Sequence, residues 1–205
     1  MKPCWIITLL ALLLRVPAYA DPVLDAFVAK VAASCVSFDY SYRTLGNVPL
    51  TGGGKAQVQD DAFHLTGNGL EVWCDGTTRW SADPDSRELV IETVGEGRDY
   101  AGNPALLISF LEEAFTLASS GEETFAGKRL HAVRLLPKVS AGLEEVQLFF
   151  SAKGALQGAR VRMPDGTVTE FTLSAFSFGE PVPPDVFMYD PSGLDDSWVI
   201  SDFRY

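Results

Sequence analysis

The chain has 205 residues and a formal net charge of −11, with 27 acidic and 16 basic side chains. A chain of this length builds one domain with a sizeable core and is short of what two domains usually need. The acidic surplus is scattered, and nucleic acid and anionic membrane surfaces both require a basic patch, so neither is expected as a partner. We expect a monomer.

Residues 1–20 have the pattern of a secretory signal peptide. Lys2 is followed by the ten-residue, predominantly apolar run from Trp5 to Leu14 and by the small-x-small cleavage pattern Ala18-Tyr19-Ala20. The alternative is a membrane anchor, but a bilayer span needs roughly 20 apolar residues. Cys4 precedes the apolar run, whereas a lipidated cysteine would follow it. We therefore expect export to the periplasm of a Gram-negative envelope and a soluble mature domain over residues 21–205.

The mature domain is predicted to begin with an amphipathic helix that leads into a strand. Asp21-Pro22 supplies an N-cap and a proline at the first helical position, and apolar residues recur at helical spacing to about Ser34. The period changes to two over residues 35–43, which indicates a half-buried strand. The sequences Gly46-Asn47 and Gly52-Gly53-Gly54 are predicted to break that strand.

A meander of short strands is predicted next, because turn sequences separate segments with strand composition. These strands are expected over residues 55–59, 62–66, 70–74, 77–82 and 88–94. The turns between them are predicted at Asp60-Asp61, Gly67-Asn68-Gly69, Asp75-Gly76 and Asp83-Pro84-Asp85.

A second helix and a second group of strands follow the loop over residues 95–103. Asn103-Pro104 is the predicted N-cap, and an apolar stripe indicates a helix that ends near Ser119-Ser120-Gly121. Later strands are expected over residues 123–125, 128–136, 144–151, 159–163 and 168–178, with a short closing segment over 198–203.

The predicted fold is mainly β, of the α+β class, with about ten antiparallel strands in a curved sheet and two helices over its concave face. A sheet of this size curls, and helices covering its concave side leave a pocket lined by inward-facing residues. Those residues are expected to be Phe38, Tyr40, Tyr42, Leu70, Val72, Trp80, Leu89, Ile91, Leu148, Phe150, Phe171 and Leu173, with Leu107, Phe110 and Leu111 of the second helix. An ordinary packed core is the alternative interpretation of the same residues.

Catalytic motifs are scarce, so an enzyme is not expected. The only near-neutral bases are His64 and His131, and neither lies in a metal-binding or nucleophile motif. Adjacent glutamates such as Glu112-Glu113 diverge on a helix or strand and cannot share one reacting bond. Asp60-Asp61 and Asp83-x-Asp85 lack the spacing of a calcium loop, and turn chemistry explains them better. No metal site is expected, and a hydrolase that uses either histidine is the remote alternative.

Two cysteines, Cys35 and Cys74, remain in the mature chain, and the periplasm allows disulfides to form. Sequence spacing does not show whether their Cα atoms come within bridging distance. A disulfide and a pair of buried free thiols are therefore both left open.

The chain resembles the LolA-like family of periplasmic carriers of outer-membrane lipoproteins, in particular its divergent Bacteroidetes branch. The strongest similarity is the segment Gly69 to Trp80, in which Asp75-Gly76 precedes the tryptophan by a few residues. Similarity extends to residues 27–42, Gly52-Gly53-Gly54-Lys55, Asp83-Pro84, Phe176-Ser177-Phe178 with Pro181 to Pro184, and Ser201 to Arg204.

The resemblance implies an incomplete β-barrel with a helical lid that binds the acyl chains of lipoproteins. It implies transfer from an inner-membrane exporter to an outer-membrane acceptor, with no cofactor and no catalysis. The alternative is a sensing or scaffolding module of the same fold, which binds a lipid or a lipidated partner without transport. Asp60-Asp61 stands where proteobacterial carriers have an arginine-proline step that helps to latch the lid.

Overall fold

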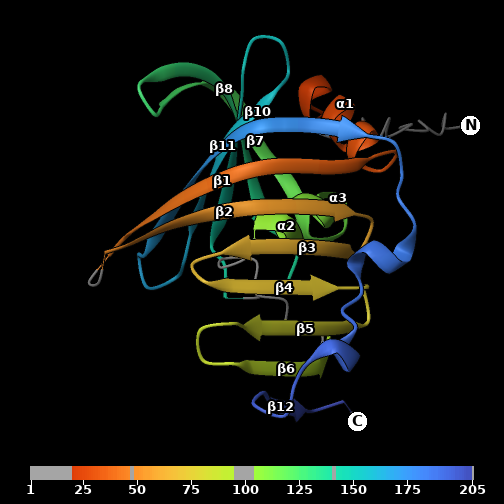
Figure 1. Ribbon diagram of the computed structural model, residues 1–205. Coiled ribbons are helices and arrows are strands. Elements are labelled where there is room, and N and C mark those ends of the chain that lie inside the picture. Colours follow the sequence, from red (N-terminus) through yellow and green to blue (C-terminus); the bar gives the residue numbers. More distant parts are fainter. Residues whose placement is uncertain (1–19, 47–48, 95–103, 140–141, 205) are drawn as a thin grey trace, which may run out of the picture.

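One long curved sheet dominates the computed structural model, which describes residues 20–46, 49–94, 104–139 and 142–204. The sheet contains twelve strands, and the predicted mainly β, curved architecture is confirmed (Figure 1). Most of the predicted signal peptide, the Asn103 cap and the loop over residues 95–103 lie outside the described residues. No helix in the described ranges is long and apolar enough to cross a membrane.

The elements follow one another in two groups of strands separated by two short helices. The first group comprises α1 (Pro22–Val31), β1 (Cys35–Leu45), β2 (Leu50–Gln59), β3 (Ala62–Gly67), β4 (Leu70–Cys74), β5 (Thr78–Asp83) and β6 (Glu88–Thr93). The helices are α2 (Pro104–Ser109) and α3 (Leu111–Ala114). The second group comprises β7 (Phe115–Phe125), β8 (Lys128–Pro137), β9 (Glu145–Phe150), β10 (Leu156–Arg162) and β11 (Val168–Gly179). A tail with the 3-10 turns η1 (Pro184–Phe187) and η2 (Pro191–Gly193) then leads to β12 (Val199–Asp202).

The two meanders are joined side by side through β1 and β11. The strand order is β12-β6-β5-β4-β3-β2-β1-β11-β10-β9-β8-β7, so among the described strands β12 and β7 form the open edges of an incomplete barrel. All pairs are antiparallel except β12 with β6, which is parallel. The expected antiparallel sheet gains one parallel strand at its edge, because the tail crosses the sheet before β12 reaches β6 (Figure 1).

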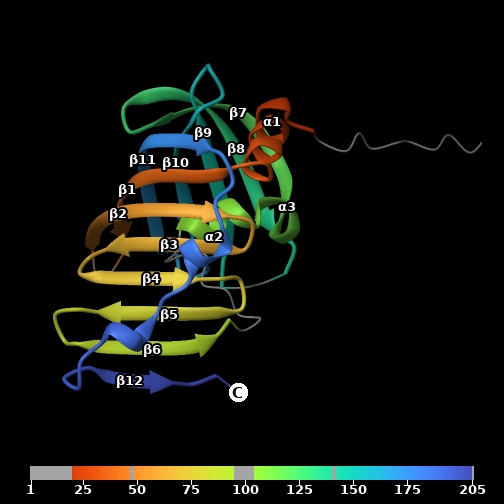
Figure 2. The same ribbon diagram turned by 45° about the vertical axis from the view of Figure 1, so that its right-hand side comes forward.

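The two faces of the sheet are covered by different parts of the chain. Directly paired residues share a face, so the pairing of Tyr40 with Gly54 and with Leu173 places all three on one side. This side curls around α2 and α3, whose apolar residues join the main core (Figure 2). The tail after β11 crosses the outer face over β3 to β6 (Figures 1 and 2).

The second helix is shorter than its apolar spacing predicts. Helical structure ends at Ala114, and Phe115 is already extended, with φ −129° and ψ 158°. Residues 115–125 instead form β7, an edge strand paired along its whole length with β8. Ser119, Ser120 and Gly121 are weak helix formers. The hydrogen bonds to β8 therefore override the local helical pattern.

The glycine run that was predicted to break the first strand lies inside β2. Gly52 and Gly54 sit directly opposite Tyr42 and Tyr40 of β1. A Cβ atom on Gly54 would lie 1.6 Å from the carbonyl oxygen of Thr66 on β3. The glycine is therefore required by close approach of the neighbouring backbone rather than by a turn.

Replacing Gly54 with alanine should lower the free energy of unfolding by about 2–3 kcal/mol, because the added methyl group overlaps backbone that cannot move aside. Gly121 on β7 is the matched control, since a Cβ atom there meets nothing within 4 Å. Gly121→Ala should change stability by less than about 0.5 kcal/mol. Urea denaturation followed by circular dichroism measures both, and equal effects would refute the packing argument.

Candidate functional site

A cavity of about 300 Å³ opens on the concave side, at the end of the sheet that lies away from α1. The strands β1 to β4 and β11 supply its walls. Its lining consists of Tyr40, Tyr42, Thr44, Leu50, Leu65, Gly67, Asn68, Leu70, Val72, Thr169 and Phe171. Five of these were expected from the sequence: Tyr40, Tyr42, Leu70, Val72 and Phe171.

Two tyrosines form one wall of the cavity, and each ring lies over glycine backbone. Tyr40 and Tyr42 are paired with Gly54 and Gly52, so no side chain on β2 pushes the rings away. The Tyr40 hydroxyl donates to the Thr66 carbonyl oxygen at 3.4 Å. The Asn68 amide nitrogen donates to the Tyr42 hydroxyl oxygen at 2.8 Å. Both polar ends are thereby tied to the wall, and the apolar ring faces line the cavity.

The described lining of the cavity is neutral. Burial, with the neighbouring Tyr42, raises the pKa of Tyr40, so its hydroxyl stays protonated at physiological pH. The hydroxyls of Thr44 and Thr169 bond to each other across the β1–β11 pair at 3.0 Å. Such a surface suits an apolar chain that carries a neutral polar group, because burying a charge there would lack compensation.

The mouth of the cavity exposes leucine side chains. Leu50 is 56% exposed and Leu70 is 46% exposed, and both also line the interior. Leu50 begins β2 and Leu70 begins β4, so the two stand at the rim from different strands. An apolar ligand can therefore keep contact with carbon atoms while it passes from solvent to the interior.

Seven of the expected cavity residues lie in the packed core instead. The main apolar cluster includes Phe38, Leu107, Phe110, Leu111, Leu148, Phe150 and Leu173, all at most 7% exposed. Residues of α2 fill much of the concave side, because Ala105, Leu106, Leu107 and Ile108 are all buried. For these seven positions the ordinary-core interpretation describes the structure.

Trp80, Leu89 and Ile91 were expected to face inward, and the structure contradicts this. In the β4–β5 hairpin Trp73 pairs with Trp80 and Val72 pairs with Ser81, so Trp80 and Val72 point to opposite faces. The three residues form a separate outer cluster against which Trp73, Tyr189, Leu194 and Trp198 pack. The tail supplies three of these covering residues, so the outer face of β5 and β6 is apolar because the tail buries it.

The sequence reasoning missed Thr44, Leu50, Leu65, Gly67, Asn68 and Thr169. Thr44 continues the period of two set by Tyr40 and Tyr42, and Leu65 follows the buried Phe63 in the same way, so both carried a usable signal. Asn68 carried none, because its contact with Tyr42 joins a turn to a strand 26 positions away.

The two cysteines do not pair. Both are buried and free, with Cys35 on the outer face of β1 and Cys74 on the concave face of β4. The strands β2 and β3 lie between them, so three strand spacings, or roughly 14 Å, separate β1 from β4. Disulfides need Cα atoms within about 7 Å. The Gln57 amide bonds to the Cys35 sulfur at 3.2 Å, and burial raises the pKa of the Cys74 thiol.

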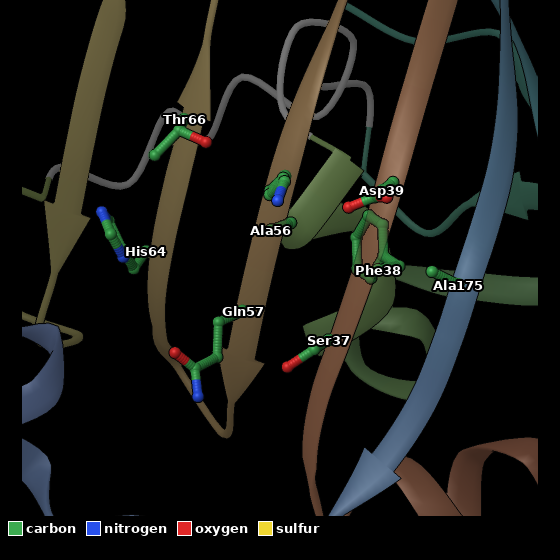
Figure 3. Close-up of a pocket in the computed structure, with 9 residues that line it drawn as sticks. Ser37, Phe38, Asp39, Ala56, Gln57, His64, Thr66 and Ala175 are labelled. Atoms are coloured by element: carbon green, nitrogen blue, oxygen red, sulfur yellow. The ribbon is translucent and has the colours of Figure 1, made fainter.

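Neither histidine lies in the cavity. His64 stacks on Trp73 with 4.7 Å between ring centroids, and its Nε2 is 3.1 Å from Glu71. It lines a depression of about 280 Å³ on the outer face of β1 to β3, with Ser37 and Gln57 nearby (Figure 3). His131 contacts Asp21 at 2.8 Å. The described residues contain no group of three or more potential metal ligands.

Comparison with known proteins finds likeness at the level of structure. No family profile matches the chain, and no curated protein sequence matches it. A LolA superfamily protein from Nitrosomonas europaea matches 80% of this chain and 97% of its own, with 10% identity and a TM-score of 0.47. A DUF1329 family protein from Desulfovibrio piger matches 83% and 98%, with 15% identity and a TM-score of 0.46. Both likenesses are weak, so the function proposed below rests on the cavity.

The contact between Asp21 and His131 should make stability depend on pH. Burial alone would raise the pKa of Asp21, but hydrogen bonds from the Leu24 N–H, Ser120 and His131 hold it below 3.8. A lowered pKa in the folded state means that the carboxylate stabilises the fold above its unfolded pKa, and that this stability is lost as pH falls through the folded pKa.

Asp21→Ala should therefore lower the free energy of unfolding by about 1–3 kcal/mol at pH 7, through loss of the α1 cap and of the His131 contact. The difference from the unmodified protein should shrink below about pH 4. Urea denaturation at several pH values measures it, with the exposed Asp196→Ala as control. A difference that grows toward low pH would contradict the assignment.

The free thiols give a second check on the fold. Without reductant, Cys35 and Cys74 should react slowly with a maleimide in the native protein, because both are at most 3% exposed. Both should react fully after denaturation. Peptide mass mapping of the unreduced protein identifies the labelled residues. A cross-linked Cys35–Cys74 peptide from freshly purified protein would show that the two strands are not arranged as described.

Proposed function

We propose that this chain is a carrier or chaperone for acylated lipoproteins and holds an acyl chain in the cavity beside Tyr40, Tyr42 and Val72. The observation that carries the proposal is the cavity itself, which is neutral, largely apolar and bordered by exposed leucines at its mouth. An open half-barrel can form such a site at one end of its concave face while the rest of that face remains packed core. The LolA-like resemblance of the sequence supports the same conclusion.

The energetics suit reversible binding. Each methylene that leaves water contributes about 0.8 kcal/mol, so a handful of methylenes is enough for measurable affinity. The tyrosine and threonine hydroxyls and the Asn68 amide reduce the apolar gain relative to a purely aliphatic site. A carrier requires this balance, because it must also release its cargo.

The size of the cavity sets how much lipid fits in this conformation. About 300 Å³ is at the lower end of the range of roughly 300–1,000 Å³ for ligand pockets. The remaining concave volume is filled by α2 and α3, including Leu106 and Leu107. A lipid with several acyl chains therefore requires outward movement of these two short helices, which act as the cover of the half-barrel.

The site of action in this proposal is the periplasm. Residues 1–20 carry the signal-peptide pattern, and the exporter of the inner membrane and an acceptor of the outer membrane are the partners that a carrier needs. No catalytic group is assigned, since the cavity holds neither histidine.

Val72→Trp should abolish most acyl binding, because the indole ring would occupy the cavity. Val199→Trp is the matched control, since Val199 is 60% exposed on β12 and is not part of the cavity. Titration with a fluorescent sixteen-carbon fatty acid should show at least about tenfold weaker binding for Val72→Trp and an unchanged affinity for the control. Equal affinity of both variants would place the lipid elsewhere and refute this site.

A transfer assay separates a carrier from a sensing or scaffolding module. The protein is mixed with donor vesicles that contain a fluorescent acylated lipopeptide, and with acceptor vesicles without it. Acceleration of transfer by the unmodified protein, and not by Val72→Trp, supports the carrier. Binding without transfer would replace the carrier with the module that holds a lipid or a lipidated partner.

A further inference from the structure

A furrow separates α1 from α2 and α3, on a side of the molecule that the cavity does not use. Two adjoining hollows of about 280 and 240 Å³ form it and share Val28, Leu111 and Glu112. No residue of the furrow lines the cavity. Figures 1 and 2 show α1 and α3 on the same flank, beside the end of the sheet where β1 begins.

The floor of the furrow is apolar. Leu111 and Phe115 are buried at its centre, while Leu24 and Val28 of α1 are only partly buried against the core. Ile108 of α2 extends this floor toward the β2–β3 turn. The gap between α1 and the two short helices leaves this apolar surface accessible to solvent. An apolar side chain from a partner could pack against it.

The rim of the furrow is acidic. Asp25 of α1 and Glu112 of α3 border the first hollow, and Asp60 and Asp61 of the β2–β3 turn border the second. All four side chains are exposed, and none forms an ion pair within the described parts of the chain. Lys138 is nearby, but its Nζ donates to the backbone carbonyl oxygen of Glu112 at 2.6 Å.

We infer that this furrow docks a basic amphipathic helix of a partner protein. An apolar floor between acidic rims is complementary to a helix with an apolar stripe flanked by lysine or arginine. The α1 wall has ten residues and is therefore about 15 Å long, which matches roughly three turns of such a helix. Anionic membranes are repelled by the same carboxylates, so a protein segment is the occupant that fits.

The furrow and the cavity are separate sites, and α3 links the furrow to the packed core of the concave face. Leu111 of α3 contributes to the floor of the furrow and to the core that fills the concave face. The inference goes beyond the proposed carrier function, because a scaffolding module could use the furrow equally well. Its experiment therefore reads peptide binding and acyl binding separately.

The probe is a fluorescein-labelled twelve-residue peptide of leucine and lysine in amphipathic helical order, titrated into the full chain by fluorescence anisotropy. The furrow variant Asp25→Asn/Asp60→Asn/Asp61→Asn/Glu112→Gln should bind it about tenfold or more weakly, and added salt should reduce that difference. The control variant Asp85→Asn/Glu88→Gln/Asp185→Asn/Asp196→Asn changes net charge equally at exposed positions outside the furrow. Its affinity should stay within about twofold of the unmodified protein.

A third variant tests the floor without changing charge. Ala32→Trp places an indole in the second hollow from the exposed end of α1 and should also weaken the peptide about tenfold. All variants should retain the acyl-probe affinity and circular dichroism of the unmodified protein. Equal loss in the furrow and control variants, or no effect of Ala32→Trp, would show general charge attraction and overturn the inference. Loss of peptide binding in the cavity variant Val72→Trp, equal to the loss in the furrow variant, would place the peptide in the cavity and also overturn the inference.

Discussion

The cavity depends on the contact between the tyrosine rings of β1 and the glycine backbone of β2 and β3. Tyr42 keeps its position only because Gly52 has no side chain, since a Cβ atom there would lie 2.7 Å from the Tyr42 ring. Gly67 completes this arrangement, since a Cβ atom there would lie 2.7 Å from the Tyr40 hydroxyl. The space that a side chain at Gly52 would fill is occupied by Tyr42 and Asn68, which line the cavity. Glycine, which weakens most strands, here makes room for the side chains that form the cavity wall.

The sheet has two apolar faces, and this explains both its length and its distribution of aromatic residues. The concave face is covered by α2 and α3, while the outer face of β5 and β6 is covered by the tail that ends in β12. Phe187 of η1 is 1% exposed, although it lies in a proline-rich segment without regular strands. The tail over residues 181–204 therefore acts as a second covering layer. For this reason, aromatic residues that face inward and outward look alike in the sequence.

Local sequence patterns predicted the elements better than they predicted the faces. Short-range chemistry determines the Asp21 cap, the Asp75-Gly76 turn and most strands. In the turn, for example, the Asp75 carboxylate accepts hydrogen bonds from the Thr77 and Thr78 N–H groups. The placement of Trp80 required the hairpin register, and the β structure of Phe115 to Phe125 required pairing with β8. Asn68 could not be found, because its role arises only where three strands approach one another. Long-range register, rather than composition, decided which residues form the site.

The short helices α2 and α3 connect the two proposed sites physically. Their buried residues fill the concave volume that a larger lipid would need, and their exposed side forms one wall of the furrow. A helix of four residues such as α3 has little stability of its own and is held in place by packing. A partner bound in the furrow therefore contacts the same element whose displacement would enlarge the cavity. A partner that binds more tightly to one position of α3, packed inward or displaced outward, would couple its own binding to lipid loading. By linkage, lipid loading would change the affinity for the partner by the same factor.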